Sequence, residues 1–118
     1  MRYITNLLTA AWIALFFGVS AQAQIISPQE ATDYIESNVT VEGVVSQVST
    51  SNNGTTFINF GGRFPNHVFY AVIFRKNLHQ FSNVRALEGR ALAVSGKIQL
   101  YKGKPQIILY SPTQIEMR

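Results

Sequence analysis

The 118-residue sequence has no cysteine, one aspartate and two histidines, and these shortages exclude several kinds of protein. Without cysteine there is no disulfide framework, no thiol chemistry and no lipid anchor through an N-terminal Cys. His67 and His79 lie on different predicted elements without a carboxylate cluster, so a zinc or hydrolytic metal site lacks ligands. We expect each to be a loop or surface residue.

Nucleophile and phosphate-binding motifs are also missing. No G-x-S-x-G elbow accompanies the serines, and Ser95-Gly96-Lys97 lacks a glycine-rich phosphate loop. Paired carboxylates for acid and base chemistry could come only from the N-terminal helix. We therefore expect no enzymatic activity, no cofactor and no metal ion.

The first 23 residues have the three parts of a secretory signal. Arg2 is the positive end, an apolar run extends over residues 7–19, and Ala21-Gln22-Ala23 is the small-residue cleavage motif. Cleavage after Ala23 predicts a periplasmic or secreted protein that keeps no membrane segment, with residues 24–118 as one domain. The alternative is an uncleaved anchor, because the apolar stretch can be counted from Tyr3, although spanning needs about 20 apolar residues.

The net charge of +4 is distributed unevenly. Four of the six acidic residues precede residue 43, whereas residues 43–118 carry nine Lys and Arg residues against Glu88 and Glu116, a net charge of +7. Such a field favours polyanionic partners. The alternative is ordinary solubilising surface charge.

Residue patterning predicts five strands and two short helices. Ser27-Pro28 has the form of a helix start and predicts a short helix that extends to Glu36. Apolar residues at steps of three predict a second short helix or helical turn over residues 77–87. Gly43 and Gly96 mark bends or bulges in the two longest strands. Alternation and turn signals place the strands at residues 39–48, 55–60, 68–75, 91–101 and 105–110.

None of these elements is long enough to bury itself, and closure into a barrel solves that problem. Three strands, a helix and two strands is the order of the five-stranded Greek-key barrel called the OB-fold, with the helix between strands three and four at the bottom. We therefore predict an all-β OB-fold with a further short N-terminal helix that plugs one end.

Several motifs carry a family resemblance that covers nearly all of residues 27–116. Val41-Glu42-Gly43-Val44-Val45, Ser95-Gly96-Lys97-Ile98 and Tyr101-Lys102-Gly103-Lys104-Pro105-Gln106-Ile107 mark particular strands and one turn. With Thr56-Phe57-Ile58-Asn59-Phe60 and Pro65-Asn66, they resemble the small exported bacterial OB-fold proteins of the nucleic-acid-binding, tRNA-anticodon-binding-domain-like type. The resemblance implies the fold and a binding role, and it supplies no catalytic residues.

The predicted ligand face lies on strands two and three with the flanking loops. Its cations and flat rings suit single-stranded nucleic acid, because cations follow phosphates while rings stack on unpaired bases. We expect Phe57, Phe60, Phe69 and Phe74 in the core instead, and Tyr70 could belong to either set. The candidate binding residues are Asn59, Arg63, Phe64, Tyr70, Arg75, Tyr101, Lys102 and Lys104.

Two functions follow from this face. The first is binding of single-stranded nucleic acid with little sequence preference. The second is an exported interaction or stress module that binds a protein, peptide or small polar ligand, which export itself favours because nucleic acid is scarce outside the cytoplasm. A third, substrate gripping for a secreted nuclease, needs a partner. The sequence leaves the oligomeric state open.

Overall fold

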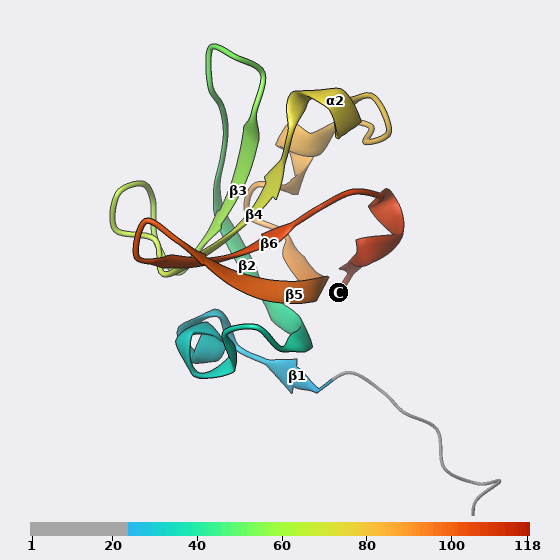
Figure 1. Ribbon diagram of the computed structural model, residues 1–118. Coiled ribbons are helices and arrows are strands. Elements are labelled where there is room, and N and C mark those ends of the chain that lie inside the picture. Colours follow the sequence, from blue (N-terminus) through green and yellow to red (C-terminus); the bar gives the residue numbers. More distant parts are fainter. Residues whose placement is uncertain (1–23) are drawn as a thin grey trace, which may run out of the picture.

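The computed structural model describes residues 24–118, and the predicted signal segment, residues 1–23, lies outside the described residues. Seven strands and four short helices follow one another along the chain (Figure 1). The strands are β1 (Ile25–Ile26), β2 (Asn38–Thr50), β3 (Thr56–Phe60), β4 (Phe69–Ile73), β5 (Ala91–Tyr101), β6 (Lys104–Ile108) and β7 (Ile115–Met117). The helices are η1 (Pro28–Tyr34), α2 (Arg75–Leu78), η2 (Val84–Leu87) and η3 (Pro112–Gln114), of which the three η elements are 3₁₀ helices.

Five of the strands close into a barrel, as predicted. β2 pairs antiparallel with β3 and also with β5, β3 pairs with β4, and β5 pairs with β6. The ring is completed by β4 and β6, which run parallel. β1 and β7 are additions that the sequence did not predict: β1 lies parallel to β2, and β7 lies antiparallel to β5.

Strand β2 belongs to both sides of the barrel. Its first half pairs with β5 in unbroken register from Asn38 to Val44, and its second half pairs with β3. Of the bend or bulge predicted at Gly43, the bulge alternative is wrong, because Gly43 pairs with Leu92 in this unbroken register. The register slips instead between Val45 and Gln47, where β2 changes partner. A glycine is required at position 43 because of close packing, since a Cβ there would lie 2.7 Å from Cγ of Pro28.

The N-terminal helix packs against β2, β4 and β6 as an end plug. It is a 3₁₀ helix that ends at Tyr34, two residues earlier than predicted, and it buries Pro28 and Ala31. Ser27 and Glu30 form a capping box at its start, with Glu30 accepting from the Ser27 amide at 2.8 Å. The plug thus closes one end of the apolar core.

The short helix or helical turn predicted over residues 77–87 is present as two separate short helices. The chain forms α2 and then η2. Asn83 lies between them in a left-handed conformation with φ 50°, and a right-handed helix cannot continue through such a residue. Apolar residues three apart fit short 3₁₀ turns as well as an α-helix. The predicted apolar stripe, Leu78, Phe81, Val84 and Leu87, still packs against the core.

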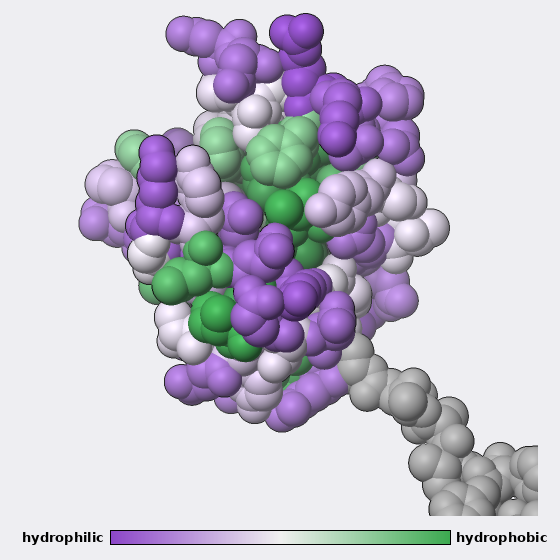
Figure 2. Space-filling view, viewed as in Figure 1, coloured by the Kyte–Doolittle hydropathy of each residue, from purple (hydrophilic) through white to green (hydrophobic). Residues whose placement is uncertain are grey.

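The core is formed by the inward side chains of all five barrel strands. Phe60 and Phe69 are fully buried there, with ring centroids 5.5 Å apart. The core assignments of Phe57 and Phe74 were wrong: Phe57 is half-buried, and Phe74 is 39% exposed because β4 has already ended. On the face of the molecule that Figure 2 shows, apolar side chains reach the surface only in separate patches among polar residues.

No helix within residues 24–118 has both the length and the apolar character needed to span a membrane.

Candidate functional site

A groove runs over the outer face of β3, β4 and β6. It consists of two adjoining hollows, of about 260 Å³ and about 400 Å³, which share Phe57, Tyr70 and Tyr101. The remaining residues of the first hollow are Ser49, Asn59, Phe64, His67, Lys102 and Lys104. Those of the second hollow are Ser51, Asn53, Thr55, Val72, Phe74 and Gln106.

Two connections form the walls of the first hollow. The loop of residues 61–68 between β3 and β4 lies beside the tip of the β5–β6 hairpin at the left of Figure 1. Strand alternation supplies the floor: Phe57, Asn59 and Tyr70 face outward while Ile58, Phe60 and Phe69 fill the barrel.

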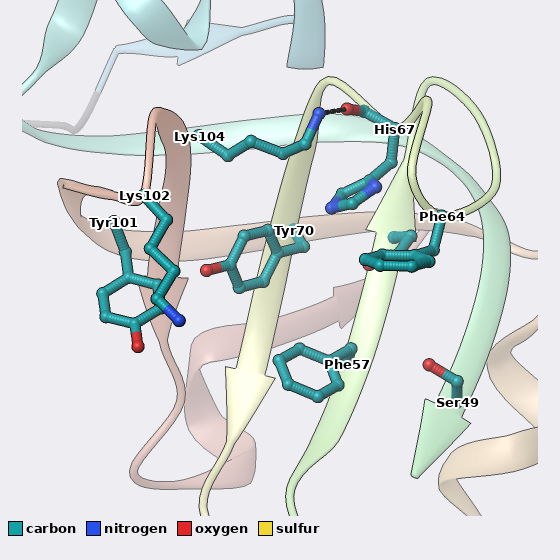
Figure 3. A pocket seen from close by; sticks show the side chains of 9 residues that line it. Ser49, Phe57, Phe64, His67, Tyr70, Tyr101, Lys102 and Lys104 are labelled. Atoms are coloured by element: carbon teal, nitrogen blue, oxygen red, sulfur yellow. Dashed lines mark hydrogen bonds between the residues drawn. The ribbon is translucent and has the colours of Figure 1, made fainter. Parts of the chain in front are cut away.

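Four aromatic side chains follow one another along this hollow. Phe57 meets Tyr70 edge to face with centroids 5.8 Å apart, and Tyr70 meets His67 in the same way at 5.5 Å. His67 is stacked on Phe64 at 5.8 Å. Figure 3 shows Tyr101 across from these rings, on the hairpin. The hollow therefore offers flat apolar faces on both sides.

The bulge in β2 fixes the β3–β4 loop. Gln47 Oε1 accepts hydrogen bonds from the Phe64 amide at 2.8 Å and from Asn59 Nδ2 at 3.1 Å. Next to it, Ser46 Oγ accepts from the Gly62 amide at 3.0 Å. Because the register slip brings two consecutive side chains to the loop, a local irregularity of β2 positions the first wall.

His67 lies in the β3–β4 loop, one of the two expected placements, but it is buried, with 5% of its surface exposed, so the surface alternative was wrong. The rings of Phe64 and Tyr70 cover it. Its main-chain carbonyl accepts a hydrogen bond from Lys104 Nζ at 2.6 Å. Burial, and secondarily the charge of Lys104, lowers the pKa of the imidazole, which favours its neutral form.

The hairpin side of the groove is exposed and cationic. Tyr101 is 53% exposed, and Lys102 Nζ lies 5.4 Å from the centre of its ring. Burial, and secondarily Tyr101, raises the pKa of Tyr70, so its phenol stays protonated. The hairpin wall thus adds one exposed aromatic ring and two ammonium groups to the hollow.

No acidic side chain lines either hollow. The acidic residues in ion pairs lie elsewhere: Glu36 contacts Lys97 at 3.1 Å, and Arg118 contacts Glu42 and Glu116 at 2.5 and 2.6 Å. Among residues 24–118, Lys102 and Lys104 make no salt bridge. Their charges are therefore available to a ligand in the groove.

The structure brings together six of the eight candidate residues in the first hollow and leaves two outside it. Arg63 is exposed, and its Nη1 donates to the Ser46 carbonyl at 3.4 Å. Arg75 packs along Gly54 of the β2–β3 turn. The six that line the hollow are Asn59, Phe64, Tyr70, Tyr101, Lys102 and Lys104.

Three residues that line the first hollow were not predicted from the sequence: Ser49, Phe57 and His67. A signal for Phe57 was present, since it shares strand parity with Asn59. His67 gave no signal, because only the folded loop places its imidazole on Tyr70.

Neither family models nor curated proteins give a match to this sequence. Several solved structures do match the fold of this chain. An OBody bound to hen egg-white lysozyme superposes with a TM-score of 0.60 and 15% identity, over 85% of this chain and 98% of the OBody. A second OBody complex with the same lysozyme gives 0.56 and 17%, over 84% and 96%.

A protein assigned as an aspartyl-tRNA synthetase from Leishmania major Friedlin gives a TM-score of 0.56 and 9% identity. The match covers 85% of this chain and 21% of the synthetase, so the chain corresponds to about a fifth of that protein. At these identities the likeness concerns the fold alone. Together with the strand pairing, it identifies the chain as an OB-fold domain with a groove over β3, β4 and β6.

Proposed function

We propose that this protein is an exported OB-fold that binds single-stranded nucleic acid in the groove, with stacking and phosphate contacts as the main interactions. The observation that carries the proposal is the composition of the first hollow. Aromatic rings line it together with two lysines that make no salt bridge, and none of its lining residues is acidic. Stacking of a base on an aromatic side chain contributes about 1–3 kcal/mol, and lysines attract the phosphates.

The size of the first hollow supports a ligand that enters one flat group at a time. Pockets for drug-sized molecules measure roughly 300–1,000 Å³, whereas this hollow measures about 260 Å³. The second hollow continues the surface past Phe57, Tyr70 and Tyr101. A chain of bases could therefore occupy both hollows, with Tyr70 and Tyr101 between neighbouring bases.

The test is a titration of the protein, residues 24–118, with a labelled oligonucleotide of about 12 nucleotides at about 50 mM salt. We expect saturable binding that weakens as salt rises, because each neutralised phosphate releases counterions. A double-stranded oligonucleotide of the same sequence is the matched control and should bind less, since its bases are not free to stack. Absence of binding at low salt would overturn the proposal.

A protein partner is the second candidate. The OBody structures are OB-fold chains bound to lysozyme, so a domain of this size and fold can bind a folded protein. In this chain the exposed rings of Phe64 and Tyr101 would be the apolar anchors of such an interface. Retention of a partner by a Lys102→Ala and Lys104→Ala variant that no longer binds oligonucleotide would favour this candidate.

A further inference from the structure

Two buried polar atoms of the first hollow have no hydrogen-bond partner. They are Asn59 Oδ1 and His67 Nδ1. The two residues are 2% and 5% exposed, and both line the hollow. An unsatisfied buried polar atom costs about 1–3 kcal/mol, so a ligand that supplies the missing partner recovers that cost on binding.

The identity of the free Asn59 atom follows from its neighbours. The Phe64 amide can only donate, so the Gln47 atom 2.8 Å from it must be the oxygen. That same oxygen lies 3.1 Å from the Asn59 side-chain amide, which must therefore present its NH₂ group. The carbonyl oxygen of Asn59 is thus the atom left over, and it can only accept a hydrogen bond.

Phe64 covers the His67 side of this hollow. Its ring stacks on the imidazole of His67 and is 72% exposed, so it covers the site without being packed into the core. Rotation of this side chain would uncover the inner end of the hollow. The main chain of Phe64 would stay in place, because its amide is bonded to Gln47.

We propose that the first hollow is a base-selective subsite, in which Phe64 swings aside for one nucleobase whose exocyclic amino group donates a hydrogen bond to Asn59 Oδ1. This inference rests on the proposed function and adds the ligand's chemistry to it. Adenine, cytosine and guanine carry such an amino group, whereas thymine does not. Thymine offers only an N–H between two carbonyl oxygens, and one of these would be forced toward the Asn59 oxygen.

His67 complements this selection. As a neutral imidazole its Nδ1 can either donate or accept, so it can pair with the ring nitrogen next to the amino group. Its ring also provides a stacking surface once Phe64 has moved. The subsite therefore combines one fixed acceptor with one adaptable partner.

The experiment compares two oligonucleotides that differ only in the amino group. Oligo(dA) of about 12 nucleotides is titrated against the same strand in which purine, lacking the 6-amino group, replaces every adenine. We expect the purine strand to bind roughly tenfold more weakly, because Asn59 Oδ1 then stays unpaired. Oligo(dT) should be similarly weak.

The variant Asn59→Leu should lose the difference between the two strands while keeping salt-dependent binding. Asn59→Leu also loses the amide bond to Gln47, so Asn59→Asp is the matched control: it loses the same bond, keeps an acceptor oxygen and leaves the bond between Gln47 and the Phe64 amide, and it should still discriminate. Equal affinity of the wild-type protein for the adenine and purine strands would overturn the subsite and leave the proposed function standing. No binding of any strand would overturn both.

Discussion

The ammonium group of Lys104 donates a 2.6 Å hydrogen bond to the main-chain carbonyl of His67, and this bond joins the two walls of the groove. The residues are 37 positions apart in the sequence. Lys104 begins β6 next to the hairpin tip, while His67 ends the β3–β4 loop. The bond therefore holds the cationic hairpin at a fixed distance from the aromatic loop, so that a ligand meets both at once.

Burial of His67 predicts a loss of stability in acid. The folded-state pKa of His67 lies below the usual histidine value of about 6.5, so on acidification the unfolded chain takes up the proton first. The free energy of unfolding should be constant above about pH 7 and fall from about pH 6.5 toward the lowered folded-state pKa. Urea denaturation across this range measures it. His67→Gln should flatten this part of the profile, whereas His79→Gln, at an exposed position, should leave it.

The two lysines of the hairpin should set the salt dependence of oligonucleotide binding. Removal of two phosphate contacts lowers the slope of log affinity against log salt by about 1.4, at about 0.7 per contact on single strands. We expect this change for Lys102→Ala with Lys104→Ala, measured by fluorescence anisotropy from 50 to about 200 mM salt. Arg85→Ala with Arg90→Ala removes the same charge away from the groove and should change the slope far less. Equal effects of the two double variants would mean that only net charge matters.

Tyr101 should contribute by stacking. The ring lines both hollows and is 53% exposed, so Tyr101→Ala should weaken oligonucleotide binding by about 1–3 kcal/mol, or roughly 5- to 160-fold. Tyr110 is 57% exposed and lines a different hollow, which makes Tyr110→Ala the matched control. Tyr101→Leu separates stacking from apolar contact, and it should recover only part of the affinity. Unchanged binding by Tyr101→Ala would contradict a role for this ring.

Gly43 should be intolerant of a side chain. A Cβ there would lie 2.7 and 3.1 Å from Cγ and Cδ of Pro28, so the N-terminal plug would have to move. We expect Gly43→Ala to lower the free energy of unfolding by about 1–3 kcal/mol, as overpacking does. Val44→Ala on the neighbouring exposed position should cost less than about 1 kcal/mol. A Gly43→Ala protein as stable as the wild type in urea would show that the plug is not closely packed.

Strand patterning was the most informative part of the sequence. The fourth predicted strand, residues 91–101, matches β5 at both ends, and the turn residues Lys102-Gly103 mark its end. Over residues 77–87 the pattern predicted helical structure but not its division, since a period of three does not distinguish one helix from two short turns separated by Asn83. Turn residues therefore mark the end of a strand more sharply than apolar spacing marks the division of a helical stretch.

Some residues of the candidate site could likewise be predicted from the sequence, and others could not. Tyr101, Lys102 and Lys104 were predictable as a group, because they lie together on one tight turn. Arg75 was misplaced, since α2 begins at that residue and its side chain lies along Gly54. The bonds from Gln47 to Phe64 and Asn59 join positions 17 and 12 residues apart, so no local pattern signals them.

By itself, the amino-acid sequence determined the five barrel strands and the basic, aromatic hairpin, because these depend on alternation, turn chemistry and charge within short stretches. Tertiary structure alone decided that β2 slips its register beside Gln47, that His67 is buried, and that Asn59 keeps an unpaired acceptor in the groove. These features arise where segments distant in the chain compete for the same hydrogen bonds and the same space, and that competition exists only once the barrel has closed.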